Sequence, residues 1–207
     1  MSEKVEKRRA YAARMPLEQR RDSLLDAALG LVDESGVGVV TMEAVARAAG
    51  VTKPVVYGAF SNAESVLQAL VEREQARGFA QMLALLPEGV DVADPQSVTT
   101  AGMTGFLAAV RQNPATWRLL LARDGLPPAA AEARERARQY FVDQLSALAT
   151  WALADRAGGP LDPMLTAQLI VSGLEMGALL VLNDPDGFSE ERMVGFVAEV
   201  VRSIIQG

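Results

Sequence analysis

Apolar residues recur along most of the chain at the three- and four-residue spacing of an amphipathic α-helix. In residues 16–35 this spacing places Leu24, Ala28 and Leu31 on one face, and Gly36 follows as a helix terminator. Similar segments continue to the C-terminus, separated by glycine, proline and asparagine rather than by the alternating pattern of strands. The pattern predicts an all-α protein of about nine helices.

Capping residues and breakers set the expected helix boundaries. Thr41 and Thr52 are expected to cap two short helices, because threonine side chains accept hydrogen bonds from helix N-termini. Gly50 lies between them and allows a tight left-handed turn. With the helix at 16–35, the predicted helices cover about 41–49, 52–59, 61–78, 95–112, 114–121, 128–157, 163–183 and 189–205.

Two short helices joined by a glycine turn are typical of a helix-turn-helix. Ala46 is a small residue where the two helices would cross, and the second helix would present its N-terminal turn to a DNA major groove. A generic helical hairpin with the same turn is the alternative. The candidate DNA-binding residues here are Thr52, Lys53, Pro54 and Tyr57 on the second helix, with Thr41 at a helix N-terminus suited to phosphate oxygens.

Charge is distributed unevenly, although the net charge is −6. Residues 1–21 hold seven bases and three acids, whereas residues 61–207 hold 11 bases and 18 acids. A basic N-terminal arm on an acidic body indicates an anionic partner, and a solvated tail without contacts is the alternative. In the arm, Arg8, Arg9 and Arg14 are the candidates for contacts with DNA phosphates or the minor groove.

The chain contains no histidine and no cysteine. This composition excludes a disulfide framework, a thiolate nucleophile, a Cys/His zinc site and a Ser-His-Asp triad. Residues 36–41 approach a dinucleotide-binding fingerprint, but they lack its third glycine and follow a helix rather than a strand. We therefore expect no enzyme activity, no metal and no cofactor.

Residues 17–70 combine several spaced motifs. The first helix contains Leu24-x-x-Ala27-Ala28, and the later motifs are Val45-Ala46-x-x-Ala49-Gly50-Val51 and Tyr57-x-x-Phe60, before a helix that opens at Asn62. In this order and spacing the segment resembles the DNA-binding domain of the TetR family of bacterial transcriptional regulators. The resemblance implies an all-helical homodimer that binds operator DNA and a small-molecule effector. It divides the chain into a basic arm (1–15), a helix-turn-helix domain (16–62) and a ligand-binding and dimerisation domain (63–207).

Two positions depart from the family's pattern. The family usually has a phosphate-contacting lysine where this chain has Ala63, and an aromatic residue or histidine where it has Ala59. The recognition helix is therefore poor in hydrogen-bond donors, and the basic arm is interpreted as a compensation. The alternative is a helical ligand-binding or protein-interaction scaffold that has lost operator binding.

Ligand residues do not transfer from the family, because its C-terminal region varies widely. Large or polar residues on apolar helical faces are the candidates, with ordinary core packing as the alternative: Phe79, Met82, Met103, Phe106, Trp117, Tyr140, Trp151 and Glu175. Glu175 is the single charge in residues 163–183. Three alternatives are open for it: to orient an amine or hydroxyl of a ligand, to pair with an arginine such as Arg118 or Arg123, or to face water.

Residues 163–183 are long enough to cross a bilayer. They lack the flanking Lys, Arg, Trp or Tyr of a membrane helix, and residues 1–15 lack the apolar stretch of a signal peptide. We therefore expect a cytoplasmic protein with no membrane partner, in which this helix is buried between other helices or two subunits. The expected dimer residues are Leu169, Gly173, Gly177, Val181, Val194, Val197 and Val201.

Together these observations predict a homodimeric repressor that a small-molecule ligand releases from double-stranded operator DNA. An activator is the alternative within the same class of regulators.

Overall fold

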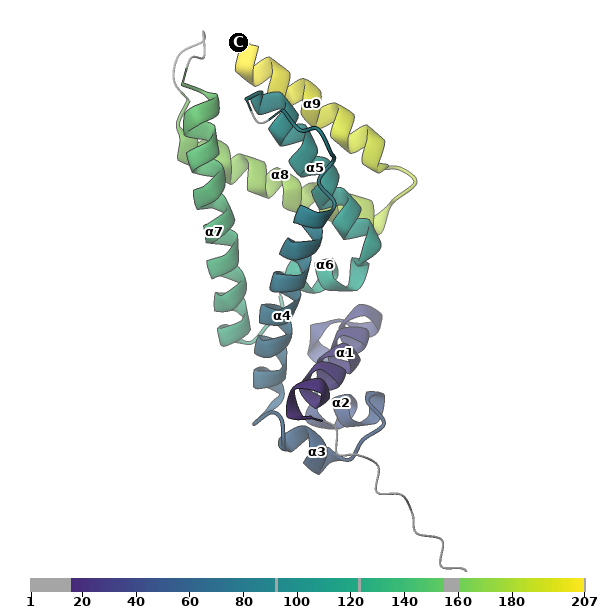
Figure 1. Ribbon diagram of the computed structural model, residues 1–207. Coiled ribbons are helices and arrows are strands. Elements are labelled where there is room, and N and C mark those ends of the chain that lie inside the picture. Colours follow the sequence, from purple (N-terminus) through teal and green to yellow (C-terminus); the bar gives the residue numbers. More distant parts are fainter. Residues whose placement is uncertain (1–15, 92, 123, 155–160, 207) are drawn as a thin grey trace, which may run out of the picture.

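The computed structural model describes residues 16–91, 93–122, 124–154 and 161–206, and the regular structure within these ranges is entirely helical, which confirms the all-α prediction. Helices α1 to α3 lie at one end of an elongated molecule, and α5, α8 and α9 lie at the other (Figure 1). The elements are α1 (Leu17–Ser35), η1 (Val37–Val39), α2 (Met42–Ala48), α3 (Lys53–Tyr57), α4 (Ala63–Ala84), α5 (Pro95–Gln112), α6 (Pro114–Leu120), α7 (Pro128–Ala152), α8 (Pro163–Asn183) and α9 (Glu190–Gln206).

The turn between α2 and α3 forms where the sequence predicts it. Gly50 has a φ of +65°, and the Thr41 hydroxyl accepts a hydrogen bond from the Ala44 amide at 3.0 Å. Thr52 occupies the position before α3, but its side chain caps nothing. The expected cap fails because Pro54 has no N–H and the Val55 amide already donates to the Thr52 carbonyl.

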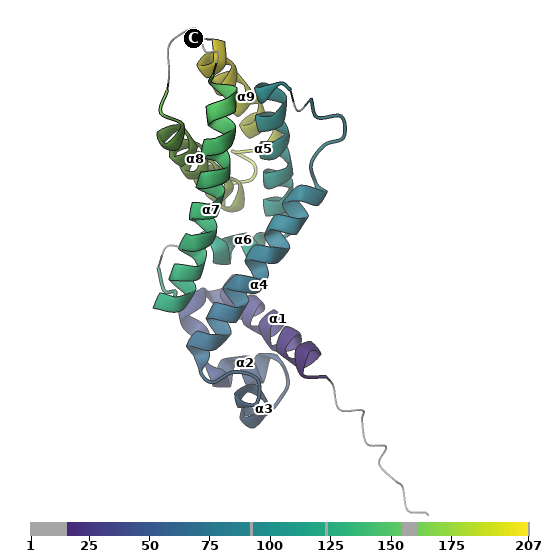
Figure 2. The same cartoon turned by 60° about the vertical axis from the view of Figure 1, so that its left-hand side comes forward.

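Helix α4 connects the two ends of the molecule (Figure 2). Asn62 and Ser65 form a capping box at its start, with a 2.8 Å bond from the Ser65 amide to Asn62 Oδ1. The helix continues to Ala84, past the end predicted at Gly78. Gly78 is buried in mid-helix, where a Cβ would lie 3.3 Å from the Trp117 ring, so close packing rather than termination explains this glycine.

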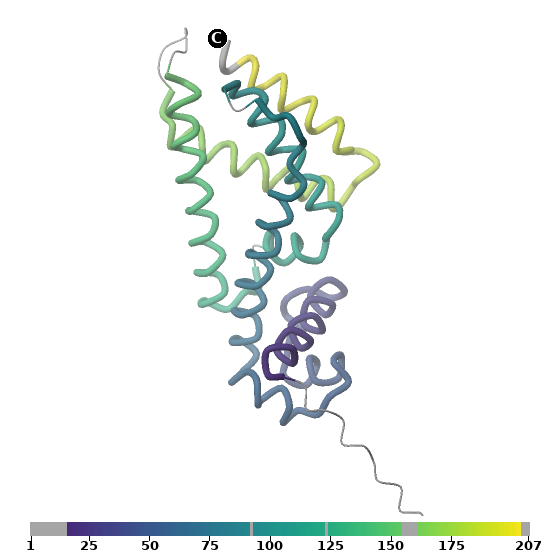
Figure 3. Tube along the Cα trace, in the orientation of Figure 1, coloured from purple at the N-terminus to yellow at the C-terminus, as the bar shows by residue number. Residues whose placement is uncertain are grey.

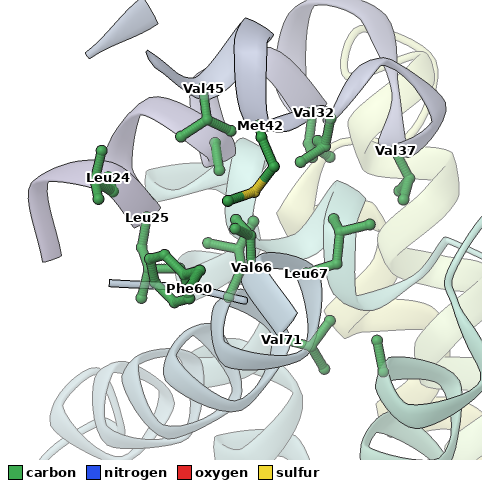
Figure 4. Close-up of a cluster of buried hydrophobic side chains, with 14 of the residues drawn as sticks. Leu24, Leu25, Val32, Val37, Met42, Val45, Phe60, Val66, Leu67 and Val71 are labelled. Carbon is green, nitrogen blue, oxygen red and sulfur yellow. The ribbon is translucent and has the colours of Figure 1, made fainter. Parts of the chain in front are cut away.

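One hydrophobic core anchors the helix-turn-helix to the rest of the chain. Leu24, Val45 and Phe60 pack against Val66 and neighbouring residues of α4 (Figure 4). Leu119 of α6 and two alanines of α7 belong to the same core. The N-terminal helices are therefore packed directly against α4, α6 and α7.

At the opposite end, α8 crosses between α7 and α5, as the trace in Figure 3 shows, and α9 packs on α5. Helix α7 ends at Ala152, earlier than the predicted 157, and residues 155–160 lie outside the described part of the chain. Helix α8 is long and apolar enough to cross a membrane by length and composition alone. It contacts α7, α5 and α6 within the bundle.

Candidate DNA interface and ligand cavity

The recognition helix α3 lies on the surface at the end of the molecule. Buried Val56 attaches it to the core, and this leaves one exposed surface on the helix. That surface carries the four predicted contact residues Thr52, Lys53, Pro54 and Tyr57. Tyr57 is 54% exposed, which is unusual for a large aromatic side chain and suits a residue that meets a partner.

Two further basic residues of this domain differ in whether their side chains are free to contact a partner. Arg47 of α2 is exposed and has no ion pair or hydrogen bond to its side chain among the residues described, so it is a candidate phosphate contact that the sequence interpretation omitted. The sequence feature that could have identified Arg47 is its position in the helix that precedes the Gly50 turn. Arg21 instead stacks on the Phe60 ring, 4.2 Å from its centroid. Thr41 is exposed, and Arg8, Arg9 and Arg14 lie outside the described residues.

Lys53 forms an exposed ion pair with Glu43 of α2, with 3.3 Å between Nζ and Oε2. Glu43→Gln removes this competitor for Lys53 and one negative charge beside the exposed surface of α3. We expect duplex DNA to bind about two- to five-fold more tightly at low salt, which fluorescence anisotropy measures. Glu132→Gln is the matched control, because Glu132 is equally exposed and pairs with Arg136 on α7. Equal gains from both substitutions would contradict a specific role for Glu43.

A cavity of about 710 Å³ lies among α4, α5, α6, α7 and α8. Six of the predicted ligand residues line it: Phe79, Met82, Phe106, Trp117, Tyr140 and Glu175. Met103 does not line the cavity and is buried in the core formed with α8 and α9. Trp151 is 46% exposed near the end of α7 and lies outside the lining. The sequence interpretation missed Arg138 and Phe141 of α7, which line the same cavity.

Glu175 is paired with Arg138. The Arg138 Nε donates to Glu175 Oε1 at 2.9 Å, and its two other nitrogens donate to Gln168 at 3.1 Å and Ser172 at 3.3 Å. Of the alternatives for Glu175, pairing with an arginine is the one that the structure shows, but the partner is not Arg118, which pairs with Asp33 of α1. Arg123 lies outside the described residues.

Helix α6 connects the cavity to the DNA-binding helices. Trp117 lines the cavity, whereas the next residue, Arg118, pairs with Asp33 of α1. Thr116 donates a 2.5 Å hydrogen bond to Glu74, a carboxylate of α4 that is 1% exposed. Three consecutive residues of α6 therefore contact the cavity, α1 and α4.

The predicted dimer residues fall into two groups. Leu169 and Gly173 lie on the solvent-exposed face of α8, and Val201 is partly buried. Val181 is buried within the subunit, and Val194 and Val197 pack against the same core. A Cβ on Gly177 would lie 3.0 Å from Met193 of α9, so that glycine admits a helix of its own chain. Other large apolar side chains are exposed on α8 and α9: Leu165, Met176, Phe196 and Val200.

Comparisons with known proteins show which proteins share this sequence motif and this fold. Residues 24–70 match the family model described as bacterial regulatory proteins, tetR family. No curated protein matches the chain in sequence. A candidate transcriptional regulator from Pseudomonas aeruginosa PAO1 has a TM-score of 0.76 at 14% identity, covering 92% of this chain and 91% of that one.

Two further solved structures share the fold. A TetR-like transcriptional regulator from Rhodococcus sp. RHA1 has a TM-score of 0.72 at 19% identity, covering 91% and 97% of the two chains. A complex of SmeT with triclosan has a TM-score of 0.70 at 19% identity, covering 89% and 90%. Residues 24–70 therefore carry the helix-turn-helix of the tetR family of bacterial regulatory proteins, and the chain as a whole shares the fold of TetR-like transcriptional regulators.

Proposed function

We propose that this protein is a homodimeric repressor that a small molecule in the α4–α8 cavity releases from operator DNA. Residues 1–15 would form a basic arm, 16–62 the DNA-binding domain, and 63–207 the ligand-binding and dimerisation domain. In this arrangement two copies of α3 would enter successive major grooves about 34–36 Å apart. Thr52, Lys53, Pro54 and Tyr57 would contact base edges, while Thr41 and Arg47 would contact phosphates.

The observation that carries this proposal is the position of α6 between the cavity and the DNA-binding helices. A ligand that displaces Trp117 acts on the helix whose Arg118 holds α1 and whose Thr116 holds α4. Such a ligand favours a different spacing of the two α3 helices, and this difference is the coupling that allosteric release requires. The complex of SmeT with triclosan supports a small-molecule ligand, because that protein shares the fold.

The exposed apolar face of α8 and α9 supports the homodimer. Leu165, Leu169 and Met176 recur at helical spacing on α8, and Phe196 and Val200 lie on α9. A monomer leaves these large apolar side chains in water, whereas a two-fold contact with a second copy would bury them on both subunits.

Filling the cavity by substitution tests release without knowledge of the ligand. Gly102 of α5 lines the cavity, and a Cβ there would meet no atom within 4 Å. We expect Gly102→Phe to weaken binding to the DNA upstream of the protein's own gene about ten-fold, because the ring mimics a bound ligand. Fluorescence anisotropy with the operator and a scrambled duplex measures both affinities.

Gly30→Phe is the matched control, since Gly30 is an exposed α1 residue whose Cβ would also meet no atom within 4 Å. Unchanged operator affinity in Gly102→Phe would contradict ligand-dependent release. A wild-type protein that binds neither duplex would instead favour the helical scaffold that has lost operator binding.

A further inference from the structure

We infer that the ligand of this cavity is an uncharged aromatic molecule that bears a hydrogen-bond donor, such as a phenolic hydroxyl. The inference rests on the proposed function only in taking the cavity as the effector site. Three properties of the lining carry it: aromatic walls, cancelling charges, and unused acceptor oxygens.

The walls of the cavity are mainly aromatic and aliphatic. Phe106 and Trp117 form an edge-to-face pair with 4.9 Å between ring centroids, and Phe79 and Phe141 form another at 5.5 Å. Aromatic surfaces of this kind favour flat ligands, which stack or pack edge-on against the rings. A volume of about 710 Å³ accommodates two or more linked rings.

The charges in the lining cancel. Arg138 is neutralised by Glu175, and three of its nitrogens already donate to Glu175, Gln168 and Ser172. The other two lining charges, Arg134 and Glu135, are opposite in sign, although no ion pair joins them: Arg134 donates to the Ala122 carbonyl, and Glu135 is exposed. A ligand carboxylate would be repelled by Glu175 and an ammonium by Arg138, and the four lining charges sum to zero, so the lining as a whole favours neither ion.

Acceptor oxygens remain in the cavity after these pairings. Glu175 Oε2 and Gln75 Oε1 accept no hydrogen bond from the described residues, whereas Glu175 Oε1 and the Gln75 amide are engaged. The indole N–H of Trp117 is unpaired but fully buried, so it offers no surface to a ligand. The Tyr140 hydroxyl also lines the cavity without a hydrogen bond to the described residues, so a ligand hydroxyl can donate to these oxygens and accept from Tyr140.

Three biphenyl compounds that differ only in their polar group test the inference. Isothermal titration calorimetry of the full chain at pH 7, without DNA, compares 4-phenylphenol, biphenyl-4-carboxylate and biphenyl-4-ylmethylammonium. We expect the neutral phenol to bind at least about ten-fold more tightly than either ion. A charged compound as the tightest ligand, or no binding by any of the three, would overturn the inference.

Substitutions in the Glu175–Arg138 ion pair should change which of the three compounds binds most tightly. Glu175→Gln leaves Arg138 without its neutralising charge, so the carboxylate should become the tightest ligand, and Arg138→Gln should favour the ammonium in the same way. Glu132→Gln removes a glutamate of α7 outside the lining and should leave the order unchanged. Circular dichroism confirms that each variant is folded. An order that neither pair substitution alters would overturn the assignment to this pair.

Adding DNA separates the ligand class from the proposed function. Release of operator DNA by 4-phenylphenol supports both. A phenol that binds with the expected preference but leaves operator DNA bound supports the ligand class and contradicts release. The wild-type affinity order alone decides the ligand class, and the Gly102→Phe variant tests release without any ligand.

Discussion

Replacing Leu169 by glutamate is expected to separate the two subunits and to weaken operator binding by about 100-fold. Leu169 is 75% exposed in the single chain, so the substitution costs the fold of the subunit little. In a two-fold dimer the new carboxylate would be buried twice without a partner, which strongly opposes association. Separated subunits lose the gain in effective concentration that comes from engaging two half-sites on one duplex.

Sedimentation velocity measures the oligomeric state of this variant, and fluorescence anisotropy measures its operator affinity. Leu83→Glu is the matched control, because Leu83 is an exposed leucine of α4 outside α8 and α9. It should remain dimeric and bind the operator as the wild type does. A Leu169→Glu protein that stays dimeric at micromolar concentration would show that subunits do not meet through this face.

The features that the sequence predicts well are set by neighbouring residues. Asp94 and Asp162 each accept hydrogen bonds from amides two and three residues later, and Gly50 alone supplies the left-handed turn before α3. Such features depend on a few consecutive residues, so the helix starts and the helix-turn-helix follow from the sequence. Thr52 is the exception, because a proline two residues later removes the donor that its side chain needs.

The features that the sequence does not predict depend on distant partners. Glu175 pairs with Arg138, 37 residues earlier in the chain, and not with Arg118, which the sequence analysis named. Val181 and Leu169 are both apolar residues of α8, yet one is buried in the subunit and the other faces solvent. Helical periodicity identifies an apolar position but does not say whether its own chain or a second copy covers it.

Within the subunit, Arg73→Met is expected to lower stability strongly. Arg73 Nε donates to Glu74 Oε1 at 2.9 Å, while Nη1 reaches Asp26 of α1 at 2.8 Å and the Asp22 carbonyl at 3.0 Å. Without Arg73, the buried Glu74 carboxylate keeps only Thr116 and the more exposed Arg77. We expect the free energy of unfolding to fall by about 3–5 kcal/mol, because a buried charge loses its main partner.

Urea unfolding followed by circular dichroism, at one fixed protein concentration, measures this loss. Arg77→Met is a stringent control, since Arg77 contacts the same Oε1 atom from 3.3 Å but is half exposed, and it should cost less than about 1 kcal/mol. The double variant Arg73→Met/Glu74→Leu should recover about half of the loss, because it removes the charge that was left unpaired. A double variant as unstable as Arg73→Met would place the cost in the lost contacts to Asp22 and Asp26. In that case Arg73 would stabilise the protein mainly by holding α1 against α4, and its neutralisation of the buried Glu74 carboxylate would contribute little.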